Sequence, residues 1–289
     1  MKTKNSNSLA TRLCLAPYSV WAAIFIVVPL FFVAYYAFTD NSFRFTTENV
    51  VRFFAATSAI SDNGVSREVH TYLLIFGRSV KLAVISTFLC FLLGYPLAYI
   101  IAHAPDRTQN ILITLIMIPM WMNFLIRTYA WMTILQDSGI LNAALSALHL
   151  PNVHIIGTEA AVVIGMVYDF LPYMILPIYS VMAKMDERLI EAARDLGCNS
   201  FGVLRRVIWP LSLPGVFSGM NMVLIPSIST FYISQKLGSG KFFLIGDAIE
   251  QQYVANNLHF AAAIAFVFMV VLLIGMTVLQ RLAARRTVI

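Results

Sequence analysis

The sequence has little charge for its length. Only 12% of its 289 residues are Asp, Glu, Lys or Arg, whereas 59% are hydrophobic and the mean hydropathy is +0.77. A soluble domain carries on average about twice that fraction of charged residues. The composition therefore excludes a soluble enzyme of this length and predicts a polytopic membrane protein.

Cysteine is also scarce, and its positions exclude a disulfide or zinc framework. Cys14, Cys90 and Cys198 are odd in number and lack the short spacings of metal ligands. The histidines are scattered over loops and span ends, which is poor spacing for a metal site. They are His70, His103, His149, His154 and His259. No metal or other cofactor is expected.

The chain lacks a catalytic constellation as well. Gly240-Lys241 has neither the upstream glycine nor the following Ser or Thr of a phosphate-binding loop. We therefore expect a chain that is not an enzyme and that takes its energy from a partner which hydrolyses ATP. The net charge of +6 does not indicate a nucleic-acid partner, because the basic residues are scattered between apolar segments.

What the sequence does contain is a series of long apolar segments. Six of them have about 20 residues or more, enough to cross a bilayer as helices. They are residues 15–38, 82–102, 111–135, 160–182, 207–233 and 260–279. Prolines lie within most of them, which membrane helices tolerate where neighbours or water satisfy the freed carbonyl groups. The expected fold is all-α, with six transmembrane helices in a bundle that can move.

The distribution of Lys and Arg indicates the orientation. Lys2, Lys4 and Arg12 precede an apolar stretch, as in a signal peptide, but the stretch is too long and has no small-residue cleavage site. We interpret it as a retained first span. With the N-terminus in the cytoplasm, twelve of the twenty Lys and Arg lie on the cytoplasmic side, seven lie outside, and Arg127 lies within a span. Both termini are therefore expected in the cytoplasm, together with the loop between the fourth and fifth spans.

That loop is the one strongly charged segment, and it reads Glu191-Ala192-Ala193-Arg194-Asp195-Leu196-Gly197. Apolar residues recur along it at helical spacing and form a stripe. The stripe consists of Leu189, Ala192, Ala193 and Leu196. Gly197 is the type of residue that ends a helix in the left-handed conformation, and Asn199 or Ser200 can cap a second helix. The pattern predicts a helix–glycine–helix elbow on the surface.

The elbow resembles the signature loop of bacterial ABC-importer permeases, in which Glu-Ala-Ala, three residues, Gly and nine residues lead to an Ile-x-Leu-Pro-like end. Here the end reads Val207-Ile208-Trp209-Pro210, with Val for Ile and Trp for Leu. The resemblance implies the type I ABC importer permease fold and a loop that docks on an ATPase subunit and transmits its motion to the membrane helices. The residues that take this role are Glu191, Ala192, Ala193, Gly197 and Pro210.

Two further segments are similar to the permeases of spermidine/putrescine importers. The third span contains Pro119-Met120-Trp121-Met122-Asn123 followed by Arg127-Thr128-Tyr129, and the fourth runs from Tyr168 through Pro172 to Pro177-Ile178-Tyr179. Leu244-Ile245-Gly246 agrees too, so the resemblance extends from about residue 72 to the C-terminus. It implies a polyamine substrate. Permeases for thiamine, iron and other small solutes share much of this pattern and stay open as alternatives.

Charged and aromatic side chains of the third and fourth spans are candidates for a translocation path or gate. They are Trp121, Asn123, Arg127, Tyr129, Tyr168, Asp169 and Tyr173. A polyamine favours carboxylates and aromatic faces, and an intramembrane carboxylate is costly unless it is paired or functional. On straight helices, Arg127 and Asp169 share a depth of roughly 12–14 Å below the outer surface. We expect an ion pair between them, with a direct cation contact of Asp169 as the alternative. The aromatic rings either line the path or pack the helices.

The expected organisation follows. Residues 1–74 are the N-terminal tail, first span and outer loop, residues 75–281 are the permease domain, and residues 282–289 are a cytoplasmic tail. One elbow and six spans make half of a two-sided importer. We therefore expect a heterodimer with a second permease subunit, two ATPase subunits and an extracytoplasmic substrate-binding protein at the lipid bilayer of the bacterial inner membrane.

A secondary transporter would show several intramembrane charges and no docking elbow, and a membrane scaffold would need neither broken spans nor Asp169.

The outer loops are candidates for contact with the binding protein. In the first, residues 40–72, Thr46 or Thr47 is suited to cap a short helix over residues 48–56. This helix either touches the delivering protein or lies on the lipid surface. The loops at residues 136–159 and 235–259 are candidates for the same contact.

Overall fold

The computed structural model describes residues 16–55, 57–59 and 67–287. The expectations for the basic N-terminus and for the end of the C-terminal tail lie outside this part of the chain. The described residues are almost entirely helical, and their strands are β1 (Thr57–Ala59) and β2 (Arg67–Val69), which form an antiparallel pair. The chain divides into two compact units, Met1–His70 with Ile249–Val271 and Thr71–Ala248 with Leu272–Ile289.

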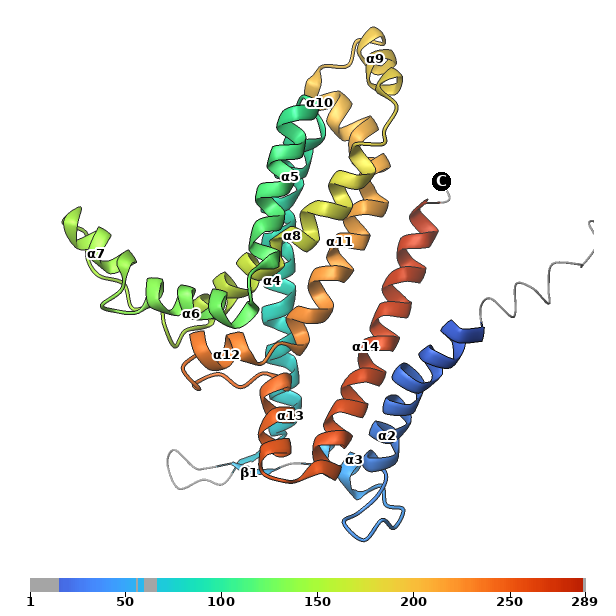
Figure 1. The fold of residues 1–289 in the computed structure, drawn as a ribbon, viewed down its shortest axis with the longest axis vertical. Coiled ribbons are helices and arrows are strands. Elements are labelled where there is room, and N and C mark those ends of the chain that lie inside the picture. The colour runs from blue at the N-terminus through green and yellow to red at the C-terminus, as the bar shows by residue number, and fades with distance from the viewer. Residues whose placement is uncertain (1–15, 56, 60–66, 288–289) are drawn as a thin grey trace, which may run out of the picture. The chain divides into compact units, whose positions relative to one another are not determined.

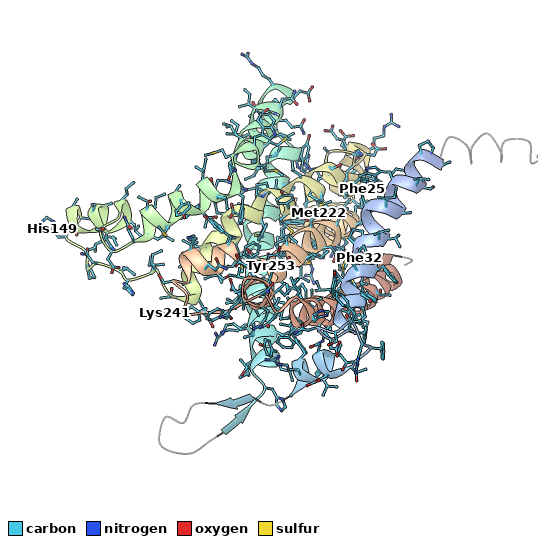
Figure 2. All side chains as sticks on the ribbon, turned by 60° about the horizontal axis from the view of Figure 1, so that its bottom comes forward. Phe25, Phe32, His149, Met222, Lys241 and Tyr253 are labelled. Carbon is cyan, nitrogen blue, oxygen red and sulfur yellow. The ribbon has the colours of Figure 1, made fainter. Side chains whose placement is uncertain are left out.

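The first unit contains the first apolar helix, Ala16–Ala37. A π-helical turn at Ala23–Val27 leads into α2 (Val28–Ala37), whose Pro29 lacks the N–H that a regular helix would use there. Large apolar side chains project from this helix, among them Phe25 and Phe32 (Figure 2). A long helix with apolar side chains on its surface matches a lipid environment, and it agrees with the first expected span.

The first unit also contains α3 (Glu48–Phe54), part of α13 (Ile245–Val254) and the first half of α14 (Leu258–Thr287). The Glu48 N–H donates to the Thr46 hydroxyl at 3.2 Å, and Phe53 is buried. The Arg52 guanidinium lies 4.4 Å from the centre of the Phe260 ring. The short helix expected in the first outer loop is therefore present, although it ends at Phe54. Whether it contacts a binding protein or lipid stays a prediction.

Three long helices make the core of the second unit: α4 (Thr71–Ala102), α8 (Glu159–Met182) and α11 (Trp209–Ser229) (Figure 1). Small residues allow α8 and α11 to approach closely. A Cβ added at Gly215 would lie 2.9 Å from the Pro177 carbonyl oxygen, and one at Gly219 would lie 3.0 Å from the Met174 carbonyl oxygen. The two backbones are thus in near contact, and Met174 and Ile178 are fully enclosed between the helices.

This close approach makes a testable prediction for Gly215→Ala. The added methyl group meets backbone atoms of α8, which cannot move without separating the helices, so the protein is expected to lose about 1–3 kcal/mol of stability. Gly275→Ala in α14 is the matched control, because a Cβ there meets nothing within 4 Å; it should be neutral or stabilise by about 0.5–1 kcal/mol. Thermal unfolding of the purified proteins in one detergent measures both, and equal midpoints would contradict the close packing.

The expectation that the third span is one helix over residues 111–135 is wrong. The structure has α5 (Asp106–Trp121) and α6 (Phe124–Leu135), and the chain bends by 94° between α5 and the segment Phe124–Ala147 that begins with α6. Pro119 removes a donor near the end of α5, Met122 is extended with ψ 145°, and the Asn123 side chain accepts the Leu125 N–H at 2.8 Å and starts a new helix. The described chain has five single helices long and apolar enough to span a membrane, and a sixth if the bent pair counts as one span.

The fifth span also differs from the expected residues 207–233. Its helical segment is Ser200–Ser229, made of α10 (Ser200–Val203), a π-helical turn at Leu204–Ile208 and α11. It ends because Thr230 is extended, with ψ 142°, while the Ser229 hydroxyl donates to carbonyl oxygens of the last turn. The following residues form a separate helix, α12 (Tyr232–Leu237), which packs beside α6 (Figure 1).

Candidate functional site

The elbow between α8 and α11 has the expected geometry. Its first helix, α9 (Glu187–Asp195), begins at Asp186, whose carboxylate accepts the Arg188 N–H at 3.0 Å. It ends at Gly197, which has φ +85°; the Gly197 N–H donates to the Arg194 carbonyl and the Cys198 N–H to the Ala193 carbonyl. These two bonds make a Schellman motif, which requires a left-handed residue at this position.

The second helix of the elbow, α10, starts where the sequence predicted. The Asn199 side chain accepts the Gly202 N–H at 2.8 Å and so satisfies one of the free donors of the first turn. The chain then runs through the π-helical turn into α11, with Pro210 in the first turn of α11. Trp209 lies against α4, with its ring centre 5.2 Å from that of Tyr95. The elbow is therefore joined directly to the helical core.

The apolar stripe of the elbow is divided between two faces. Ala193 is buried against the rest of the unit, whereas Leu189, Ala192 and Leu196 point outward, and 87% of Leu196 is exposed. Phe201 on α10 is exposed as well. The expectation of one continuous docking stripe is thus corrected: α9 uses one edge of it for internal packing and leaves the other uncovered.

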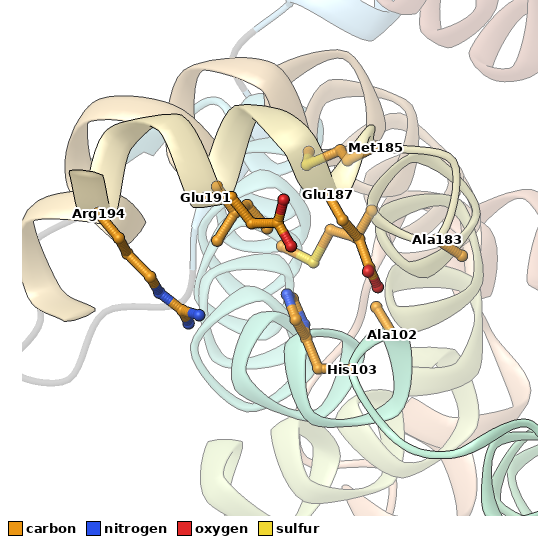
Figure 3. Close-up of a pocket in the computed structure, with 9 residues that line it drawn as sticks. Ala102, His103, Ala183, Met185, Glu187, Glu191 and Arg194 are labelled. Carbon is orange, nitrogen blue, oxygen red and sulfur yellow. The ribbon is translucent and has the colours of Figure 1, made fainter. Parts of the chain in front are cut away.

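A cavity of about 210 Å³ lies beneath the inner face of α9 (Figure 3). The ends of α4 and α8 form its floor, and α9 covers it. Figure 3 shows Glu191 pointing toward His103, which follows α4, and Glu187 pointing toward Ala102. His103 is oriented by its Nδ1, which donates to the Tyr99 carbonyl at 2.9 Å. The Glu191 carboxylate therefore borders this cavity, although the residue is exposed, a detail that the sequence pattern did not reveal.

The ion pair expected between α6 and α8 is present. Arg127 Nη1 lies 3.1 Å from Asp169 Oδ1, and the two side chains are only 9% and 3% exposed. The contact is not aligned as a hydrogen bond, and Arg127 Nε, Arg127 Nη1 and Asp169 Oδ1 have no hydrogen-bond partner among the described residues. The two charges therefore compensate each other by proximity alone. Arg127 does not reach Asp169 along a straight third span, because the chain bends between α5 and α6.

The aromatic candidates fall into different environments. Tyr168 packs on Trp131 with ring centres 5.2 Å apart, and Tyr173 lies beside Phe170 at 6.4 Å. Trp121 is 73% exposed at the end of α5. Asn123 caps α6, so its side chain has a structural task. A role of these residues in a translocation path stays a prediction.

Tyr129 belongs to a cluster that the sequence pattern missed. Its ring lies near Tyr232 and Lys236 of α12, and Phe124 borders the same group. The sequence placed Tyr232 inside the fifth span and Lys236 in an outer loop. Tyr232 and Lys236 contact α6 because the helix breaks at Thr230 and α12 takes a new direction. The sequence at the break contains no Gly or Asn that would have indicated the end of a helix.

Within the described residues no group of three His, Cys, Asp or Glu side chains is placed to hold a metal ion. Cys90 is buried and Cys198 is partly buried, and both are free thiols. The interactions that the described candidate side chains make are charge pairing and aromatic contacts.

Bent apolar helices, a packed core and a surface elbow are the features of a membrane-spanning transport subunit. The chain belongs to the family described as binding-protein-dependent transport system inner membrane component, whose model matches residues 94–289. It is 35% identical over 265 residues to the spermidine/putrescine transport system permease protein PotB of Haemophilus influenzae, covering 91% of this chain and 87% of that protein. PotB of Escherichia coli K12 is 37% identical over 204 residues, with 70% and 74% covered.

A solved structure shows the same fold. The bacterial alginate ABC transporter in complex with an alginate pentasaccharide-bound periplasmic protein contains a chain that matches with a TM-score of 0.77, at 16% identity, over 96% of this chain and 95% of that one. The likeness confirms the expected all-α importer permease fold.

Proposed function

We propose that this chain is the permease subunit through which an ABC importer moves spermidine or putrescine across the bacterial inner membrane. The observation that carries the proposal is the 35% identity to a spermidine/putrescine permease over 91% of the chain. The family membership argues against the two alternatives of a secondary transporter and a scaffold. Residues 75–281 form the permease domain in this proposal.

The elbow supplies the contact with the ATPase subunit. Leu189, Leu196 and Phe201 are large apolar side chains that the described chain leaves exposed on it. Exposed apolar residues grouped on one surface are typical of a protein–protein contact. With the elbow in the cytoplasm, the Lys and Arg distribution places both termini there too. ATP is hydrolysed by the docked subunit, because this chain has no phosphate-binding loop.

The complete importer contains further partners. One elbow provides one docking site for an ATPase subunit. A second permease subunit provides the second docking site, and one ATPase subunit binds at each. An extracytoplasmic binding protein delivers the polyamine to the outer loops. The substrate then meets the aromatic rings and the Arg127–Asp169 pair of α6 and α8.

Uptake by the reconstituted importer tests this function. We expect proteoliposomes with both permease subunits, the ATPase and the binding protein to accumulate radiolabelled spermidine or putrescine. This uptake requires ATP in the vesicle lumen, on the side of the membrane where the elbow and the ATPase lie. Excess unlabelled polyamine should compete, whereas thiamine and ferric iron should not. Uptake of labelled thiamine or ferric iron by the same proteoliposomes, with no polyamine uptake, would assign the chain to another solute.

A further inference from the structure

The ammonium group of Lys236 lies beside two aromatic rings where α6 and α12 pack together. Lys236 Nζ lies 5.2 Å from the ring centre of Tyr129 and 5.6 Å from that of Tyr232. The two tyrosine rings are 6.1 Å apart and almost perpendicular, at 77°. Phe124 stands next to Tyr232 at 5.9 Å. We call Phe124, Tyr129 and Tyr232 the aromatic cage. A cation within about 6 Å of a ring centre is attracted by the negative face of the ring.

The helix that carries Lys236 is firmly held. The buried Asp247 carboxylate accepts the Ser234 hydroxyl and the Leu244 N–H, both at 2.7 Å. The Ile245 N–H next to it donates to the Ser79 hydroxyl of α4 at 2.8 Å. These bonds fix the start of α12 relative to the core, so the cage is formed before any substrate arrives.

The charges around the cage leave Lys236 without a carboxylate. Of the carboxylates that the structure describes, none forms an ion pair with its ammonium. The neighbouring cation, Arg127, lies 5.9 Å from the Phe124 ring and is already paired with Asp169. The two tyrosine rings and the hydroxyl of Tyr129, to which Lys236 donates a hydrogen bond, are therefore the groups that face the Lys236 charge. The cage is also accessible, because Tyr129 is 45% exposed and Lys236 is partly exposed.

We propose that the aromatic cage is a binding site for a primary alkylammonium group, and that the Lys236 ammonium occupies it as a tethered placeholder which the substrate displaces. The lysine side chain ends in four methylene groups and an ammonium, so it is a chemical match for one end of an alkyl diamine. When a substrate ammonium enters, Lys236 swings outward into solvent, and no uncompensated charge remains. The identity of the displacing cation rests on the proposed polyamine function, whereas the cage itself does not.

The placeholder explains selectivity in physical terms. A monovalent cation that competes for the cage must displace a tethered ammonium of high local concentration. The site thus discriminates against weakly binding cations by occupancy, without a steric filter.

Direct binding of radiolabelled n-butylammonium tests the proposal on the assembled importer, purified without the binding protein. Lys236→Met keeps the length of the side chain and removes the ammonium. We expect it to bind n-butylammonium with a Kd lower by about tenfold than the wild type. Lys236→Gln is a second neutral variant and should show the same gain. Adding Tyr129→Leu to Lys236→Met should abolish the gain, because one face of the cage is lost.

Lys241→Met is the matched control, since it removes the same charge from the same segment at a residue outside the cage; its Kd should equal that of the wild type. An unchanged Kd in both neutral Lys236 variants overturns the proposal, as does an equal gain in Lys241→Met, which would reflect net charge alone. The binding assay needs no polyamine transport. A tenfold gain together with absent polyamine uptake by the wild type would therefore reject the proposed substrate and retain the cage.

Discussion

Asp169→Asn is expected to have the largest effect of any single charge removal in the core. It leaves the Arg127 guanidinium 9% exposed and without a counter-charge. Removing one partner of a buried pair costs about 3–5 kcal/mol, because the remaining charge stays desolvated. Hydrogen bonds do not reduce this free-energy cost, since Arg127 Nε and Nη1 have no hydrogen-bond partner among the described residues. We expect less folded subunit in the membrane and a strong loss of uptake.

A second ion pair in the same unit provides the control. Lys81 Nζ lies 2.6 Å from Glu159 Oε2, a shorter distance than in the buried pair, but the side chains are 57% and 35% exposed. Exposed pairs contribute only about 0–1 kcal/mol. Glu159→Gln should therefore leave the unfolding midpoint and the uptake close to the wild type. Equal losses in Glu159→Gln and Asp169→Asn would show that burial is not the cause.

Exchanging the two charges separates a structural pair from a substrate contact. Arg127→Asp with Asp169→Arg restores a compensated pair and is expected to assemble better than either single variant. If the pair only closes the path at rest, the exchanged protein also transports. If Asp169 meets the cation directly, the exchanged protein assembles but does not transport, because an arginine then stands at the substrate contact. Normal uptake and stability of Asp169→Asn would dismiss both roles.

The elbow could be predicted because its determinants are local. A glycine at the left-handed position and an asparagine two residues later each decide the conformation of a single turn, through bonds to residues within a few positions. The Arg127–Asp169 pair could be predicted for another reason, since a charge in an apolar span strongly favours a partner. In both cases the physical demand is visible in one segment of the sequence.

The bend between α5 and α6 could not be predicted in the same way. Pro119 within an apolar run is compatible with a mild kink, and Asn123 is compatible with a polar path residue. The Asn123 side chain caps α6, but this cap starts a separate helix only when the contacts of α6 with α8 and α12 favour a new helix direction. The aromatic cage depends on the same event, because Tyr129 and Lys236 meet only after both the third and the fifth spans break.

Gly197→Asp is expected to uncouple the permease from its ATPase. At φ +85° a side chain is disfavoured by about 1 kcal/mol, and the Schellman bonds that end α9 weaken accordingly. The new carboxylate has space within the chain, since a Cβ at Gly197 meets nothing within 4 Å. It therefore emerges beside the exposed Leu196, on the apolar surface proposed to dock. We expect copurification of the ATPase subunit to fall at least tenfold, which corresponds to about 1.4 kcal/mol of docking free energy.

Gly240→Asp is the matched control, because Gly240 also has a positive φ, +68°, with nothing within 4 Å of an added Cβ. It imposes a comparable backbone cost away from the elbow and should retain the ATPase. Glu191→Lys acts on the other face of α9, where it places a cation over the cavity beside His103. Both elbow variants should lower transport and substrate-stimulated ATP hydrolysis while the binding protein still captures substrate. Normal stimulation in Gly197→Asp and Glu191→Lys would mean that the elbow does not couple the subunits, whatever its geometry.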